Sequence, residues 1–219
     1  MAERIKYPEL NNLLRSPRLA EFAAYINQVL TSEEQARIDF YNQIDEDDKA
    51  EYINGEIIMH SPVKLWHSNA SSNLATLMHV YVQVNDLGLI GVEKLMISLT
   101  RNDYEPDIVF FRKERAADFE PKQMRFPAPD LIVEILSDST AENDRGVKYE
   151  DYGAHGVEEY WIIDPEAETV EQYLLKDGEY KLALKSADGT LKSQAMAGFN
   201  IPIRAIFDKA ENTVALKNL

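Results

Sequence analysis

The chain has 219 residues, 45% of them hydrophobic, which is ample for a sizeable core, and its lack of cysteine excludes disulfides and thiolate metal sites. No apolar run approaches the roughly 20 residues that a membrane span needs, and the N-terminus MAERIKYPEL is too polar for a signal peptide, so we expect a cytoplasmic protein without a membrane partner. Its 23 basic and 38 acidic residues give a net charge of −15, the wrong overall sign for a nucleic-acid binder.

The beginning of the chain is rich in helix-forming residues. Residues 21–44 carry apolar side chains at roughly helical spacing, whereas Pro8 and Pro17 interrupt the start. We therefore predict a helical arm over residues 1–44. The charged run DEDDKAE that follows, residues 45–51, is typical of a solvated loop or of the first turn of a helix.

A hairpin and a helix are predicted next. Asn54 and Gly55 both adopt positive φ readily, which favours a two-residue turn between two strands. Ser61 can cap a helix with Pro62 at its first position, and apolar residues at helical spacing extend that helix to about Asn85. Strands are expected within 92–99 and 107–112, followed by a polar loop through 112–128.

The stretch PDLIVEILSDST, residues 129–140, places a carboxylate inside a strand that should be apolar. Branched apolar residues surround Glu134 on both sides, as in a strand that is buried on both faces. An ionised carboxylate persists in such a place when it is paired, protonated or bound to a cation. Glu134 is therefore either half of a structural ion pair or a metal ligand.

The rest of the chain predicts one more helix and further strands. Ser139 followed by Glu142 has the form of a capping box, which predicts a helix from about Thr140 to Gly153, weakened by Gly146. A strand is expected at 158–164, and alternating residues at 170–184 around an Asp-Gly pair predict a second hairpin. No repeat or interdomain linker is evident, so we predict a single α/β domain with a helical arm.

Asp107 is a candidate partner for Glu134, since it begins another apolar strand. If the two strands are neighbours, both carboxylates can converge on one hard cation, Mg²⁺ or Mn²⁺. Lys148, on the helix that follows, can position or help to deprotonate an attacking water, provided that it reaches back about 13 Å along the helix. The alternative role for Lys148 is an exposed ion pair with Asp144, four residues before it.

Two more side chains have open roles. His67 lies in the apolar stripe of the predicted helix, so it is either a buried, hydrogen-bonded histidine or a group near the metal. Glu56 follows the hairpin turn and is either a supporting carboxylate of the site or an exposed hairpin residue. The histidines His60, His79 and His155 form no metal-ligand spacing.

The segments NGEIIMHSP, EPDIVFF, PDLIVEILSDST and GVEEYWIIDP, with His67 and a downstream lysine, resemble the Uma-two family of proposed restriction endonucleases in the PD-(D/E)XK nuclease superfamily. The resemblance covers about residues 45–208. It implies an α/β (α+β) fold with a restriction-endonuclease-like mixed sheet flanked by helices, followed by a C-terminal tail at 209–219. In that superfamily a lysine usually stands two residues after the second acid, where this chain has Leu136; lysines relocated to a neighbouring helix are known, which implies Lys148.

The resemblance implies a Mg²⁺- or Mn²⁺-dependent endonuclease that acts on DNA, with Asp107 and Glu134 as metal ligands. The expected catalytic set is Asp107, Glu134, Lys148, His67 and Glu56. A homodimer is expected, since a duplex has two strands to cut. The rival hypothesis is a catalytically inactive interaction or assembly protein with the same fold, supported by the charge of −15 and by Leu136. A basic rim around the site would favour the nuclease, and an acidic rim the rival.

Overall fold

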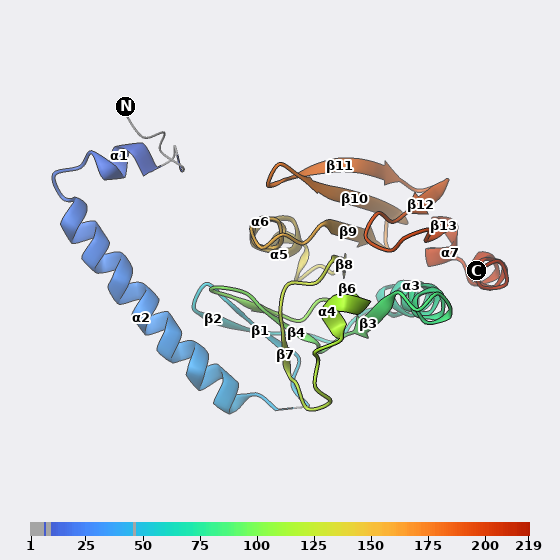
Figure 1. Cartoon of the computed structure of the whole chain (residues 1–219), viewed down its shortest axis with the longest axis horizontal. Coiled ribbons are helices and arrows are strands. Elements are labelled where there is room, and N and C mark those ends of the chain that lie inside the picture. The colour runs from blue at the N-terminus through green and yellow to red at the C-terminus, as the bar shows by residue number, and fades with distance from the viewer. Residues whose placement is uncertain (1–6, 8–9, 46) are drawn as a thin grey trace.

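The computed structural model describes residue 7, residues 10–45 and residues 47–219 (Figure 1). The parts of the predicted arm at 1–6 and 8–9, Pro8 among them, and residue 46 of the charged run lie outside the described residues. The helices are α1 (Asn11–Leu14), α2 (Leu19–Gln43), α3 (Leu65–Val84), α4 (Lys113–Ala116), α5 (Ala141–Arg145), α6 (Val147–Ala154), α7 (Arg204–Phe207) and α8 (Lys209–Leu216). The strands are β1 (Ala50–Ile53), β2 (Glu56–Met59), β3 (Gly88–Val92), β4 (Met96–Ser98), β5 (Asp103–Tyr104), β6 (Ile108–Arg112), β7 (Arg125–Phe126), β8 (Leu131–Ile135), β9 (Glu159–Asp164), β10 (Thr169–Lys176), β11 (Glu179–Ser186), β12 (Thr190–Lys192) and β13 (Asn200–Pro202).

A six-stranded sheet in the order β11-β10-β9-β8-β6-β3 forms the centre of the molecule. The sheet is mixed. Strands β8 and β9 run parallel, whereas all other neighbouring strands of this sheet run antiparallel. All five residues of β8 are buried, and they alternate between two core clusters: Leu131 and Val133 belong to one, and Ile132 to the other. The prediction of a strand that is buried on both faces is confirmed.

Helices cover both faces of this sheet. Helices α3, α7 and α8 contribute to the core on one face, together with Leu131 and Val133. Helix α6 and a second sheet, in the order β2-β1-β5-β4-β7, contribute to the core on the other face. Figure 1 shows α5 and α6 on one side of β9 and β8, and α3 on the other. The predicted mixed sheet flanked by helices is therefore confirmed.

Both predicted hairpin turns are confirmed. Asn54 and Gly55 have φ values of 52° and 89°, and Asp177 and Gly178 have 52° and 82°. These left-handed conformations close two-residue turns between β1 and β2 and between β10 and β11. The first turn brings the beginning of β1 beside the end of β2, where the site is built.

One predicted helix start and one predicted helix cap are wrong. Helix α3 begins at Leu65 with Lys64 before it, not at Ser61, because the β1–β2 ladder continues as far as a bond from His60 N–H to the Lys49 carbonyl (3.0 Å), which keeps the chain extended. The predicted start near Thr140 is confirmed, because α5 begins at Ala141, but the predicted capping box is wrong, since no side chain caps this helix. The Ser139 hydroxyl bonds instead to the Ser137 hydroxyl at 3.2 Å.

Gly146 interrupts the helix that was predicted over 140–153. It separates α5 from α6 with φ −111° and ψ −104°, and a Cβ at this position would lie 2.8 Å from the Glu142 carbonyl oxygen. Only a residue without a Cβ fits this close approach. The break changes the direction of the chain before Lys148.

The two ends of the chain attach to this body differently. Residues 209–216, within the predicted C-terminal tail, form α8, and Ala215 and Leu216 pack on the core of α3. Helix α2, whose prediction is confirmed, docks through its C-terminal part, where Phe40 is fully buried and Arg37 Nη2 donates to Asp103 Oδ1 at 2.8 Å. Its N-terminal half projects from the body (Figure 1). None of the helices in the described part of the chain has the length and hydrophobicity of a membrane span.

Candidate active site

Two adjacent antiparallel strands bring Asp107 and Glu134 together. Strand β6 pairs with β8 in a register that matches Ile108 with Val133, and the residues flanking that pair are Asp107 and Glu134. The N–H of Ile135 donates to Asp107 Oδ2 at 2.8 Å, which fixes the aspartate across the strand boundary. Both carboxylates are buried, 6% and 3% exposed. The structure therefore places these two predicted site residues side by side.

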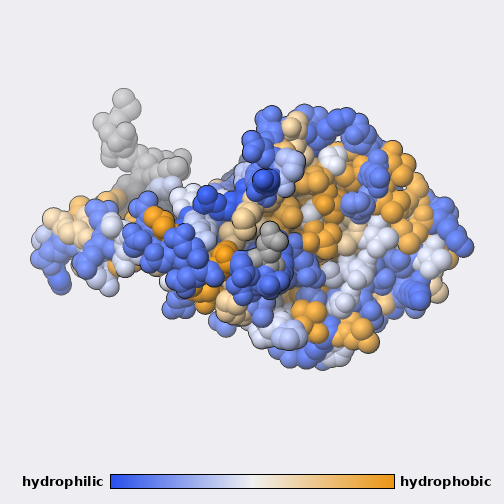
Figure 2. Space-filling view, turned by 90° about the horizontal axis from the view of Figure 1, so that it is seen from below, coloured by the Kyte–Doolittle hydropathy of each residue, from blue (hydrophilic) through white to orange (hydrophobic). Residues whose placement is uncertain are grey.

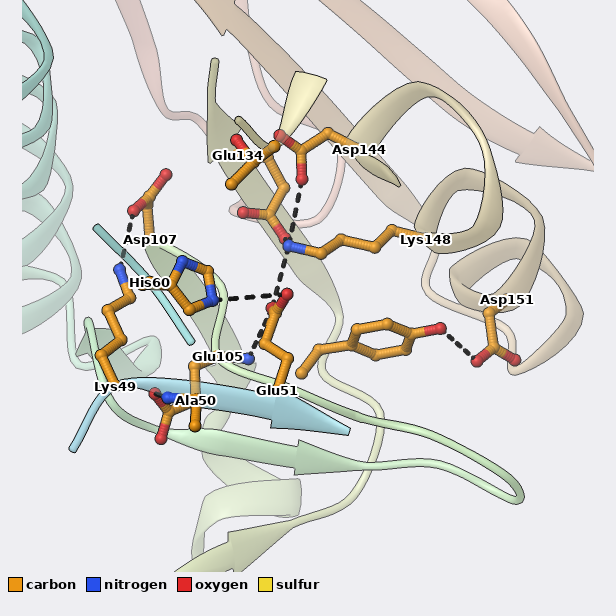
Figure 3. A network of polar contacts seen from close by, with 12 residues as sticks. Lys49, Ala50, Glu51, His60, Glu105, Asp107, Glu134, Asp144, Lys148 and Asp151 are labelled. Atoms are coloured by element: carbon orange, nitrogen blue, oxygen red, sulfur yellow. Dashed lines mark hydrogen bonds and ion pairs between the residues drawn. The ribbon is translucent and has the colours of Figure 1, made fainter. Parts of the chain in front are cut away.

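Lys148 closes one end of this site. Its Nζ lies 2.9 Å from Glu51 Oε1, 3.0 Å from Asp144 Oδ1 and 3.1 Å from Glu134 Oε1, and its side chain is only 1% exposed (Figure 3). The Tyr152 hydroxyl donates to the same Glu134 oxygen at 2.8 Å. We call these residues, Glu51, Glu134, Asp144, Lys148 and Tyr152, the closed end. The Asp144–Lys148 pair exists, but the prediction that it is exposed is wrong.

The charges of the closed end do not balance, since one ammonium faces three carboxylates. Burial raises the pKa of Glu134, and the other carboxylates add to the rise against the pull of Lys148, to about 8. Burial also raises the pKa of Glu51, but Lys148 and His60 outweigh it and hold that pKa at about 2. Without a further cation, Glu134 therefore keeps a proton near neutral pH.

Asp107 forms the other end of the site with Lys49 and His67, and we call these three residues the open end. Lys49 Nζ lies 3.3 Å from Asp107 Oδ1, and His67 Nε2 lies 3.5 Å from Asp107 Oδ2. Burial raises the pKa of Asp107, but His67, Lys49 and the Ile135 N–H outweigh this and hold the pKa at about 2. Asp107 is therefore ionised at neutral pH, and the Lys49 side chain retains 19% exposure.

A small cavity of about 40 Å³ joins the two ends, lined among others by Lys49, His67, Asp107, Glu134 and Lys148. Such a volume holds on the order of two or three waters. The cavity shares lining residues with a groove of about 370 Å³. Around that groove lie Asp138, Asp164, Glu166 and Lys64, and Lys64 pairs with Asp138 at 2.7 Å. The groove beside the site is therefore mainly acidic.

The donor set suits a hard cation held partly by solvent. Among the described residues, no group of three or more His, Cys, Asp or Glu side chains is already arranged to hold a metal ion. Mg²⁺ requires fewer protein ligands, typically one or two carboxylates completed by water and substrate phosphate. Asp107 and Glu134 beside a polar cavity meet this requirement, and the excess of acid at the closed end is the imbalance that a cation would relieve.

Glu56 lies away from the site. It is exposed beside the hairpin turn, opposite Ile53, and it is not among the residues that line the cavity. The site lies at the opposite end of this hairpin, where Lys49 and His60 meet. Of the five predicted catalytic residues, the structure brings together Asp107, Glu134, Lys148 and His67.

Glu51 and Lys49 were not predicted as site residues, because the charged run at 45–51 is typical of a solvated segment. That assignment is wrong for Glu51, which is a strand residue with 1% exposure. A signal was available, since the Asn54–Gly55 turn fixes the preceding strand and side chains at 49, 51 and 53 must then share one face. His60, also without a predicted role, lies with its Nε2 3.4 Å from Glu51 Oε2.

The fold and the buried acidic site define a protein of the restriction-endonuclease-like class. A family model described as "Putative restriction endonuclease" (Uma2) matches residues 37–204. The chain belongs to the Uma2 family. An "Uncharacterized protein sll1609" from Synechocystis is 28% identical over 128 residues, covering 58% of this chain and 72% of that protein. A crystal structure of "a putative nuclease belonging to DUF820" from Anabaena variabilis shares the fold, with a TM-score of 0.67, 22% identity, and coverage of 79% of this chain and 96% of that one.

Proposed function

We propose that this Uma2 protein is a Mg²⁺- or Mn²⁺-dependent endonuclease that hydrolyses DNA phosphodiester bonds, with Asp107 and Glu134 as the metal ligands. The observation that carries the proposal is the meeting of these two carboxylates at a small polar cavity lined by two lysines. Family membership supports the nuclease class. We further propose that the enzyme works in the cytoplasm as a homodimer.

The cation would stabilise charge on the phosphate and lower the pKa of an attacking water. The chain's own residues hold the parts in place. Lys148 makes three ion pairs, to Glu51, Glu134 and Asp144, so we assign it to positioning Glu134. His67 orients Asp107 from the α3 side. Among the described residues, Lys49 pairs with a single carboxylate, and it faces the cavity, so it is the lysine that we assign to a substrate phosphate or to the attacking water.

The rival function, a nuclease-fold interaction or assembly protein without catalysis, is favoured by one specific observation. The groove beside the cavity carries Asp138, Asp164 and Glu166 against a single lysine, Lys64. Such a rim repels the backbone of a nucleic acid, as does the net charge of −15. The nuclease proposal therefore requires DNA to approach from a direction other than along this rim, or with the divalent cation already bound.

A cleavage assay separates the two functions. Supercoiled plasmid and single-stranded DNA are incubated with Mg²⁺, Mn²⁺ or EDTA, and the matched inactive variant is Glu134→Gln, which keeps the size and removes the charge. Metal-dependent nicking that disappears in the variant supports the nuclease. Mn²⁺ binding by titration calorimetry without cleavage of either DNA supports the rival. If the protein neither binds Mn²⁺ nor cleaves DNA, the metal site itself is refuted.

DNA binding gives a second measure that does not need turnover. Binding to duplex DNA in Ca²⁺ should weaken with salt, by a slope of about −0.9 per phosphate contacted. A Lys49→Met variant should reduce that slope by about one contact if Lys49 meets a phosphate, whereas an unchanged slope would assign Lys49 to the attacking water or to Asp107 alone.

A further inference from the structure

The N-terminal half of α2 exposes an apolar stripe to solvent. Residues 19–32, which we call the arm, project beyond the sheets in Figure 1, and Figure 2 shows hydrophobic patches among polar surface on this projection. Tyr25, Ile26 and Leu30 are 68%, 45% and 46% exposed. Within the described residues, the polar contacts between α2 and the body begin at Glu33, which pairs with Arg101 at 2.6 Å.

A seam of the arm that shares Ile26 with this stripe has the spacing of a coiled coil. Leu19, Phe22, Ile26 and Val29 follow one another at intervals of three, four and three residues, and continuing the alternation through Glu33 and Ala36 reaches Phe40, the fully buried residue by which α2 docks. The body thus buries the C-terminal end of this seam, whereas in the arm Ile26 is exposed and the other three residues are only partly buried. A second helix is the shape that covers such a narrow seam.

The arm carries no charged residue after Glu21. Residues 22–32, FAAYINQVLTS, contain no Asp, Glu, Lys or Arg, in a chain of which 28% is charged. Two copies with a net charge of −15 repel one another over most of their surfaces. The arm is a surface on which two copies can meet without opposing like charges.

We propose that the arm pairs with the arm of a second copy of this chain, antiparallel and centred near residue 24. Antiparallel pairing keeps the two acidic bodies at opposite ends of the helix pair, whereas parallel pairing would bring them together. About this centre, Leu19 lies against Val29 of the second copy and Phe22 against Ile26 of the second copy, so each layer is apolar and the contact is two-fold symmetric.

Other occupants fit the arm less well. A helix that lies on a membrane surface typically presents Lys and Arg on its polar face, but the polar face of the arm carries Glu21, Asn27 and Gln28. The family match begins at residue 37, after the arm, so the arm lies outside the part of the chain that matches the nuclease family. Arm pairing therefore stands or falls independently of nuclease activity.

Light scattering coupled to size-exclusion chromatography tests the pairing in the full-length chain over a wide range of concentrations. We expect a mass twice the 25.0 kDa of one chain at high concentration. Ile26→Glu buries a charge twice in the symmetric contact and should raise the dissociation constant at least about tenfold. Gln28→Glu adds the same charge on the opposite face and should leave it unchanged. A monomer at every concentration, or a dimer equally stable in Ile26→Glu, would overturn the proposal.

Single cysteines test the direction of pairing, since the natural chain has none. Ala23→Cys lies near the two-fold axis and should form a disulfide-linked dimer under mild oxidation. Val29→Cys should not, because antiparallel pairing about residue 24 separates the two copies of position 29 by about 15 Å along the helices. Cross-linking of both variants would show parallel pairing, and cross-linking of neither would remove the arm from the interface.

Discussion

The two ends of the acidic site use the same chemistry, a lysine beside buried carboxylates, but differ in access. At the closed end Lys148 is 1% exposed and meets three carboxylates, whereas at the open end Lys49 is 19% exposed and meets Asp107. Figure 3 shows Lys148 lying among Glu51, Glu134 and Asp144, and Lys49 reaching Asp107 from the other side. A lysine that lies close to the buried carboxylates is therefore not necessarily accessible to a substrate.

Removing one carboxylate from either end should have the largest effect on activity. Asp107→Asn and Glu134→Gln each remove a proposed metal ligand, and the loss of several kcal/mol of charge stabilisation corresponds to at least about 10³-fold slower cleavage. Plasmid nicking measures the rate, and calorimetry with Mn²⁺ measures metal affinity. Unchanged Mn²⁺ affinity in both variants would exclude these residues from the metal site.

Replacing each lysine with methionine should separate support from reaction. Lys148→Met leaves Glu51, Glu134 and Asp144 buried without their cation, which should cost about 3–5 kcal/mol of unfolding free energy in urea denaturation. Lys49→Met removes one partner of Asp107, which keeps His67 and the Ile135 N–H, so it should cost less unfolding free energy than Lys148→Met, yet should slow cleavage by about 10²–10⁴.

The reverse pattern would contradict the comparison of the two ends. If Lys148→Met is as stable as the natural protein and inactive, Lys148 is the reacting lysine. Asp144→Asn is the matched control, because it removes one carboxylate from the closed end while leaving the ammonium in place.

The charge imbalance of the closed end predicts a pH-dependent stability in EDTA. In the folded protein the pKa of Glu134 is about 8, above its ordinary value of 4.5. As the pH rises, Glu134 therefore loses its proton in the unfolded chain before it does so in the folded protein. The contribution of Glu134 to stability is therefore greatest below pH 4.5 and falls as the pH rises towards 8, by at most about 1.4 kcal/mol per pH unit.

Glu134→Gln mimics the protonated acid and removes this loss. We therefore expect the unfolding free energy of Glu134→Gln minus that of the natural protein to be larger at pH 8 than at pH 5, as measured by urea denaturation. A difference that is independent of pH would mean that Glu134 is ionised throughout, with Lys148 alone compensating its charge.

Local chemistry explains why some features were predictable. The Asn54–Gly55 turn, the fully apolar flanks of Glu134 and the strand that begins at Asp107 each depend on a few adjacent residues, and the fold class follows from their order. The partnership of Asp107 and Glu134 was also within reach, since it required only that two apolar strands be neighbours.

The features that were missed depend on contacts between distant segments. Within the run 45–51, Glu51 is buried because it meets Lys148 of α6, 97 positions away (148 − 51). Asp144 is likewise buried through contacts with other segments, because its carbonyl accepts from the Tyr160 hydroxyl of β9 and its side chain pairs with Lys148, which also contacts Glu134 of β8. The spacing of four residues between Asp144 and Lys148 is the same in a buried ion pair and in an exposed one, so it could not predict that this pair is buried.

The smallest expected effect concerns Glu56, the predicted catalytic residue that lies away from both ends. It is exposed at the tip of the β1–β2 hairpin, opposite Ile53, so Glu56→Gln should change unfolding free energy by less than about 0.5 kcal/mol and leave the rate of cleavage and Mn²⁺ affinity unchanged. Glu51→Gln, on the other strand of the same hairpin, is the informative contrast, because it removes a buried partner of Lys148 and should lower both stability and activity. A loss of cleavage in Glu56→Gln with normal stability would mean that the hairpin tip contacts the substrate, and the site would then extend well beyond the cavity between Asp107 and Glu134.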